Sequence, residues 1–121
     1  MGSYLTNMKS ILIVEYEFAL RQTLSLILHR AGYHVFSAVE PWQALPLLDQ
    51  NRYDLLFIDL HSSRSDLPRL IVEIRQRNPG MPILLLTSNV NLSHSEHGVT
   101  TLSKPADPEL VLSAVKDQIG L

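Results

Sequence analysis

Four side chains of kinds that can handle a phosphoryl group each follow a separate aliphatic run of the sequence. Glu15 follows the first run, Asp59 ends the third, Thr87 follows the fourth and Lys104 follows the fifth. A carboxylate can attack phosphorus and form an acyl phosphate. A divalent cation offsets the charge of the phosphoryl oxygens, and magnesium is commonly held by one or two carboxylates together with water and substrate oxygens.

These residue types predict a role for each position. Asp59 is the candidate nucleophile, and Glu15 is a candidate magnesium ligand beside it. Thr87 and Lys104 are candidates to hold the other phosphoryl oxygens. Taken alone, each residue is more often a turn hydroxyl, a surface charge, or a turn or loop acid. The prediction therefore depends on the four residues meeting at one place.

Strand and helix patterns alternate along the chain, which would bring these four residues together. Continuous aliphatic segments predict strands at residues 10–14, 34–39, 53–59, 82–86 and, weakly, 99–102. This order predicts a parallel five-stranded sheet covered by helices on both faces, a doubly wound three-layer α/β sandwich. In such sheets ligands bind beyond the carboxyl ends of the strands, where all four candidates stand.

The helices are predicted from apolar residues at helical spacing. They cover residues 17–31, residues 40–49, a segment capped by Asp66 and ended by Asn78-Pro79-Gly80, and a last segment capped by Asp107. Pro46 predicts that the second helix is short or kinked. The inward residues predicted for the last helix are Leu110, Val111, Ala114, Val115 and Ile119. Residues 89–97 are polar and poorly patterned.

Composition narrows the classes of function. The 121 residues suit one domain, of which 45% are hydrophobic and 18% are charged. The aliphatic runs are much shorter than the ~18 apolar residues of a membrane span. A net charge of -2 without a basic block argues against nucleic-acid binding. The absence of cysteine excludes disulfides, thiolate catalysis and zinc–sulfur sites, and is compatible with the cytoplasmic location that we expect.

Six segments in a fixed order carry a family resemblance. They are Lys9 to Glu15, Ala31 to Val35, Ala44-Leu45, Tyr53 to Leu60, Pro82 to Ser88 and Lys104-Pro105. Together they resemble the receiver domain of two-component response regulators, over residues 9–121. We expect residues 1–8 to be an N-terminal extension, partly a cloning remnant. The resemblance implies a flavodoxin-like fold with strand order 2-1-3-4-5 and a cis bond before Pro105.

Several positions depart from the pattern of that family. Tyr16 stands where a second acid usually binds magnesium, and a phenol with a pKa of about 10 is a poor ligand for this cation. Glu17 follows at the start of the helix, where it could point away from the site. Thr101 replaces an aromatic that usually rotates on activation. Ser62-Ser63 and Leu67 replace the usual Met-Pro and Gly.

The spacing between Thr87 and Lys104 is also shorter than in most relatives. The missing length falls in the fourth helix of the family pattern, which we therefore expect to be short or irregular. That helix belongs to the signalling and dimerisation face of such domains. The resemblance consequently leaves the oligomeric state open.

The resemblance implies a signalling phosphoacceptor rather than an enzyme, able at most to phosphorylate and dephosphorylate itself. Asp59 would accept phosphoryl from the phosphohistidine of a histidine kinase or phosphotransfer protein, with weakened Mg²⁺ binding at Glu15 and Asp59, and would signal to an output domain or partner. The alternative is a phosphate-independent interaction module, favoured by Tyr16 and the short fourth helix.

Other interpretations are weaker. A flavin carrier would need a phosphate-binding loop after the first strand, whereas Glu15-Tyr16-Glu17 is acidic. His94 and His97 have the spacing of two metal ligands but no matched third, so we interpret them as solvated loop residues. Trp42 is interpreted as a packing or surface aromatic, and Ser62-Ser63-Arg64 as a polar loop.

Overall fold

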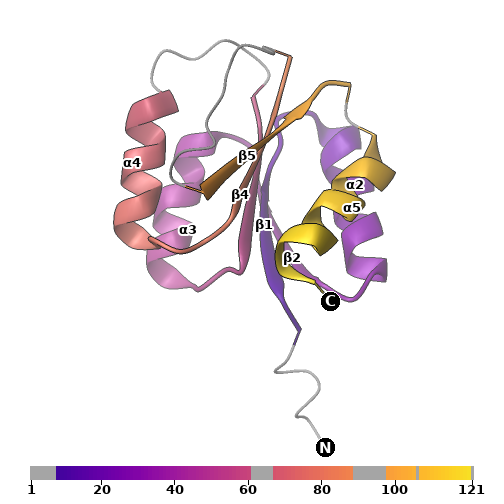
Figure 1. Cartoon of the computed structure of the whole chain (residues 1–121), viewed down its shortest axis with the longest axis horizontal. Coiled ribbons are helices and arrows are strands. Elements are labelled where there is room, and N and C mark those ends of the chain that lie inside the picture. Colours follow the sequence, from indigo (N-terminus) through magenta and orange to yellow (C-terminus); the bar gives the residue numbers. More distant parts are fainter. Residues whose placement is uncertain (1–7, 61–66, 89–97, 106, 121) are drawn as a thin grey trace, which may run out of the picture.

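The computed structural model describes residues 8–60, 67–88, 98–105 and 107–120. Within these residues, a five-stranded sheet lies between two layers of helices, and Figure 1 views it nearly edge-on. The strands are β1 (Ser10–Val14), β2 (His34–Ala38), β3 (Leu55–Asp59), β4 (Ile83–Thr87) and β5 (Val99–Ser103). The helices are α2 (Phe18–Arg30), α3 (Ala44–Gln50), α4 (Leu67–Arg77) and α5 (Pro108–Ile119), with a 3₁₀ turn, η1, at Pro41–Gln43.

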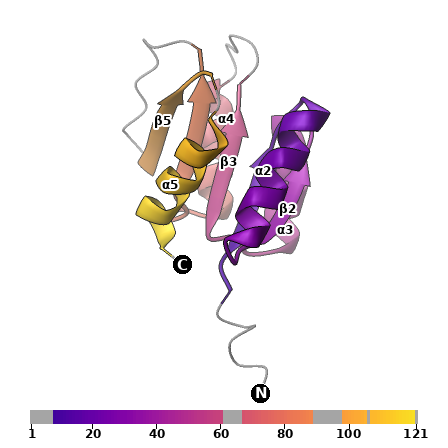
Figure 2. The same ribbon diagram turned by 90° about the vertical axis from the view of Figure 1, so that its right-hand side faces the viewer.

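The sheet has the predicted topology. Its strand order is β2-β1-β3-β4-β5, and every neighbouring pair is parallel. The register aligns the carboxyl ends, since Asp59 is opposite Leu86 and Thr87 is opposite Ser103. Figure 2 shows the arrowheads of β3, β4 and β5 pointing the same way. The predicted doubly wound fold is therefore confirmed.

The central strands are apolar on both faces because each face supports a separate core. Along β3, Leu56 and Ile58 join the cluster beneath α3 and α4, whereas Leu55 and Phe57 join the cluster beneath α2 and α5. All five residues of β3 are buried. Alternate side chains of a strand point to opposite faces, so a strand covered on both sides needs an unbroken apolar run. This two-sided burial holds β3, and with it Asp59, in a fixed place.

The helix starts follow local rules, with one correction to the predicted core. Asp107 caps α5 as predicted, because its Oδ1 accepts a hydrogen bond from Glu109 N at 3.0 Å. Val111 and Val115 are buried as expected. Leu110, however, is 51% exposed, so the prediction that it faces inward was wrong. It precedes Val111 by one residue, which on a helix turns its side chain about 100° away from the buried stripe.

The predicted second helix over residues 40–49 has a 3₁₀ start. Pro41–Gln43 forms η1, and the regular helix α3 begins at Ala44. Pro46 therefore falls in the first turn of α3, where its missing N–H has no helical acceptor to lose. The short helix that Pro46 predicted is confirmed. Trp42 packs against the core beneath α3 and α4, and the guanidinium of Arg69 lies 5.7 Å from its ring centre.

Some predictions fall outside the described residues. These are the Asp66 cap, the Ser62-Ser63-Arg64 loop, the His94 and His97 pair, and the fourth helix expected within residues 89–97. Across the ranges that are described, no helix is long and apolar enough to cross a membrane.

Two positions on α4 provide a test of the core. Ile74 is fully buried, whereas Val72 on the same helix is 53% exposed. We expect Ile74→Ala to lower the free energy of unfolding by about 2–5 kcal/mol, because it removes buried methyl groups and leaves a cavity. We expect Val72→Ala to change it by about 0.5 kcal/mol or less. Urea denaturation of both variants measures this difference, and equal effects would contradict the described orientation of α4.

Candidate functional site

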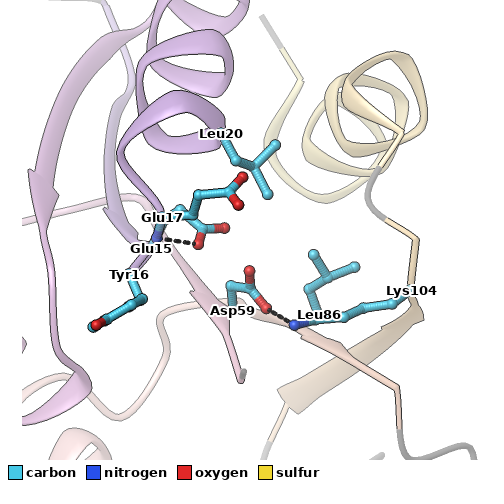
Figure 3. Close-up of a pocket in the computed structure, with 7 residues that line it drawn as sticks. All are labelled: Glu15, Tyr16, Glu17, Leu20, Asp59, Leu86 and Lys104. Carbon is cyan, nitrogen blue, oxygen red and sulfur yellow. Dashed lines mark hydrogen bonds and ion pairs between the residues drawn. The ribbon is translucent and has the colours of Figure 1, made fainter. Parts of the chain in front are cut away.

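A pocket at the carboxyl end of the sheet brings together residues that are far apart in the sequence. It is lined by Glu15, Tyr16, Glu17, Leu20, Asp59, Leu86 and Lys104, which Figure 3 shows as sticks. Three of the four candidate residues are in this set. Thr87, the fourth, is buried at the adjacent end of β4 but does not line the pocket.

The pocket is organised around an ion pair between the ends of two strands. Lys104 Nζ lies 2.7 Å from Asp59 Oδ1. The Asp59 side chain is 5% exposed, whereas the Lys104 side chain is 27% exposed. A carboxylate buried to this extent needs a compensating cation, because desolvating an unpaired charge costs several kcal/mol. Lys104 provides that cation from the solvent side of the pocket.

The backbone places Lys104 for this contact. Its N–H donates to the carbonyl of Thr87 at 3.0 Å, which extends the pairing of β4 and β5 by one residue. The N–H of Leu60 donates in the same way to the carbonyl of Leu86 at 2.8 Å. The peptide bond between Lys104 and Pro105 is cis, as predicted. Residues that follow β3 and β5 are therefore both tied to the end of β4.

Glu15 is the second buried carboxyl group of the pocket. It is 1% exposed, and its backbone N–H donates to the carbonyl of Ala38 at 3.0 Å. Its Oε2 accepts a hydrogen bond from Glu17 N at 2.9 Å. Its Oε1 is buried and accepts no hydrogen bond from a donor among the described residues. Glu15, which the sequence predicted as a magnesium ligand, therefore lies inside the pocket with one oxygen available to a cation.

Burial of Glu15 raises its pKa from 4.5 to about 8, and the neighbouring carboxyl group of Asp59 contributes through a side-chain hydrogen bond and its negative charge. The Glu17 N–H and the Lys104 ammonium lower that pKa in part. Two acids and one ammonium thus share a space that water reaches poorly. In the absence of a further cation, Glu15 keeps a proton at neutral pH.

The turn that follows Glu15 directs its neighbours to opposite sides. Tyr16 is 57% exposed, and Figure 3 shows its ring directed away from Asp59. The same view places the Glu17 carboxylate beside that of Glu15. Glu17 therefore lines the pocket instead of pointing away from it.

Arg21 fixes this turn, and sequence reasoning did not single it out. Its Nη1 donates to the carbonyl of Glu15 at 2.9 Å and to that of Tyr16 at 3.3 Å. Its guanidinium lies 5.4 Å from the ring centre of Phe18. The sequence offered one signal for Arg21, namely that it is a basic residue in the first turn of a helix that follows an acidic segment. Leu20 and Leu86 were also missed, because apolar pocket walls have the same sequence pattern as core residues.

The donor set suits a hard divalent cation. Carboxylate oxygens are ligands that Mg²⁺ prefers, and the unpartnered Oε1 of Glu15 lies beside the carboxyl group of Asp59. Within the described ranges, no three His, Cys, Asp or Glu side chains are already arranged as a metal centre. Mg²⁺ usually keeps several waters and uses one or two carboxylates, so the pair fits this cation.

The shifted pKa of Glu15 predicts a pH-dependent stability. Because the pKa of Glu15 is higher in the folded protein, the protonated side chain stabilises the fold. This contribution is complete below pH 4.5 and is lost as the pH rises through about 8. In metal-free buffer, Glu15→Gln should therefore stabilise the protein at pH 9 by at least about 1 kcal/mol more than at pH 4.5, since one pKa unit corresponds to about 1.4 kcal/mol.

Urea denaturation at the two pH values measures this difference. Glu109→Gln, at an exposed position of α5, serves as the control and should show no comparable gain at pH 9. A Glu15→Gln effect that is the same at both pH values would contradict the raised pKa.

Known proteins are similar to this chain in sequence. Transcriptional regulatory protein GlrR of Escherichia coli (strain K12) is 30% identical over 114 residues, covering 90% of this chain and 26% of that protein. Sporulation initiation phosphotransferase F of Bacillus subtilis (strain 168) is 24% identical over 118 residues, covering 93% of this chain and 95% of that protein. The chain thus spans about a quarter of the first relative's length and nearly all of the second's.

The structural comparison agrees. The receiver domain of the hybrid histidine kinase CckA superposes with a TM-score of 0.75 at 30% identity, covering 91% of this chain and 98% of that one. The response regulator receiver domain family matches residues 11–116, which include β1 from Ile11 onward, all of β2 to β5 and most of α5. The chain therefore belongs to the response regulator receiver domain family of two-component signalling.

Proposed function

We propose that Asp59 accepts a phosphoryl group from the phosphohistidine of a histidine kinase or a phosphotransfer protein. The observation that carries this proposal is the buried Asp59 carboxylate, held 2.7 Å from the Lys104 ammonium at the wall of an open pocket. Membership of the receiver family, which is a signalling phosphoacceptor family, supports it.

The proposed reaction is one displacement at phosphorus. A carboxylate oxygen of Asp59 attacks the phosphorus atom, and the P–N bond to the donor histidine breaks as the new P–O bond forms. The departing imidazole keeps the electron pair of the P–N bond. The product is an acyl phosphate on Asp59, which water later hydrolyses to inorganic phosphate.

In this proposal, two side chains of the chain and a bound cation hold the transferred oxygens. Lys104 already pairs with Asp59 and can move its ammonium to a phosphoryl oxygen without leaving the pocket. Thr87, buried at the next strand end, is the proposed hydroxyl contact, although it does not line the pocket in this state. Bound Mg²⁺, held by Glu15 and Asp59, would neutralise developing negative charge.

The proposed partners follow from this reaction. A phosphohistidine protein would supply the phosphoryl group, and an output domain or a separate protein would respond to the change at Asp59. We place the receiver unit at residues 9–121 and interpret residues 1–8 as an extension. The start of β1 at Ser10 supports this boundary.

A second function is favoured by two observations. Tyr16 is exposed, with its ring directed away from Asp59, and Thr101 occupies the β5 position where the family pattern has an aromatic residue. A domain with both changes could bind its partner in a single state, without phosphate. The two functions make opposite predictions for phosphoryl uptake.

Phosphoryl uptake tests the proposal directly. After incubation with acetyl phosphate and Mg²⁺, intact-mass analysis should show one phosphoryl adduct on the wild-type chain. Asp59→Asn should abolish this adduct, because an amide is not a nucleophile of comparable strength. Removing Mg²⁺ with a chelator should also suppress it.

The matched control is Asp54→Asn. Asp54 lies just before β3, at the opposite end from Asp59, where its Oδ2 accepts a hydrogen bond from Ser10 N at 2.7 Å. This variant should keep the adduct. An adduct that persists in Asp59→Asn would refute Asp59 as the acceptor, and no adduct on the wild-type chain would favour the phosphate-independent function.

A further inference from the structure

We propose that Glu17 binds Mg²⁺ together with Glu15 and Asp59, in the role that residue 16 cannot fill in this chain. This inference rests on the proposed function, because it concerns the same pocket. It assigns a metal-binding role to a residue outside the pair Glu15 and Asp59.

The backbone direction after β1 is the first argument. β1 ends at Val14, and Glu17 has extended backbone angles, with φ -79° and ψ 124°. The chain bends at Tyr16 and Glu17, so the alternation of the strand does not continue past Glu15. Figure 3 shows the result, with the carboxylates of Glu15 and Glu17 on the side of Asp59 and the phenol ring of Tyr16 directed away from it.

Two sets of contacts hold this arrangement in place. Arg21 donates hydrogen bonds to the carbonyls of both Glu15 and Tyr16, so the direction of the backbone at each residue is fixed. The Glu17 N–H, in turn, donates to Glu15 Oε2 at 2.9 Å. Turning Tyr16 toward Asp59 would require a different backbone direction from the one these bonds hold. The acid available to the pocket is therefore the one that follows Tyr16.

The Glu17 carboxylate also makes no capping hydrogen bond to α2. Glu17 is the N-cap residue of α2, a position whose side chain commonly accepts a hydrogen bond from the helix, yet it makes no such bond here. Its side chain is exposed at the open side of the pocket. Glutamate has a longer side chain than aspartate. Because the Glu17 side chain makes no hydrogen bond to the start of α2, it can turn toward a cation without losing a capping bond.

A separate observation points to a ligand between these acids. Glu15 Oε1 is buried, and no donor in the described ranges satisfies it. Asp59, 5% exposed, lies beside it and pairs with the Lys104 ammonium. When all are ionised, three carboxylates and one ammonium leave a formal charge of -2. One divalent cation neutralises this charge and gives the unsatisfied oxygen a partner.

Mg²⁺ binding to the intact, metal-free chain tests the inference by isothermal titration calorimetry with MgCl₂. Glu17→Gln should weaken binding by about tenfold or more. Glu109→Gln is the matched control, because it removes the same charge from an exposed position in the first turn of α5, outside the pocket. It should keep the affinity within about twofold, since salt screens distant charges.

Two further variants separate metal binding from a structural role. Glu17→Asp should keep more affinity than Glu17→Gln, because it retains a carboxylate on the Asp59 side of the turn. Tyr16→Asp introduced into Glu17→Gln should not restore affinity, because residue 16 points away from Asp59. Unchanged affinity in Glu17→Gln, with binding lost in Asp59→Asn, would overturn this inference and leave the proposed function intact. Failure of the wild-type chain to bind Mg²⁺ would also overturn it, whereas the phosphoryl adduct tests Asp59 separately. Unfolding midpoints in urea confirm that each variant is folded.

Discussion

The ion pair between Asp59 and Lys104 constrains the whole carboxyl edge of the sheet. It joins β3 to the residue that follows β5, although β4 lies between them. Such a contact forms only if the three strands end at the same level, and the parallel register provides this. Since a buried carboxylate without a cation is costly, the pair also favours this register over a slipped one.

The ion pair does not, however, neutralise all of the acidic groups in the pocket. Glu15 brings a second carboxyl group into the same poorly hydrated space, and its raised pKa is the consequence. Protonating Glu15 and binding a cation are two ways to remove the same excess of negative charge. The proposed binding of a cation at Glu15 would therefore release a proton, because a metal that contacts this carboxyl group must displace its proton.

Sequence patterns predicted the fold well because the strands are aliphatic and the helices amphipathic. They also predicted Glu15, Asp59 and Lys104 at one edge, since parallel strands leave few alternatives for where their ends meet. The side-chain direction of Glu17 was not predictable. It depends on the backbone angles of one residue between a strand and a helix, where neither periodicity applies.

The misplaced Leu110 has a related origin. The first turn of a helix has too few residues to define its apolar stripe, so a leucine there is easily assigned to the wrong side. Thr87 was predicted as an oxygen contact because of its position at a strand end. Strand position alone does not determine whether a hydroxyl group enters a pocket, and Thr87 is buried beside this one.

The two partners of the central ion pair are anchored very differently. Asp59 ends a strand whose five residues are all buried, whereas Lys104 follows the edge strand β5, of which Val99 alone is fully buried. At the start of that strand, Gly98 has a φ of 73°, and a Cβ there would lie 2.9 Å from Arg75 Nη2. The lysine side of the pocket is thus attached to less buried apolar surface than the aspartate side. We therefore expect it to move at a lower cost when the charge at Asp59 changes.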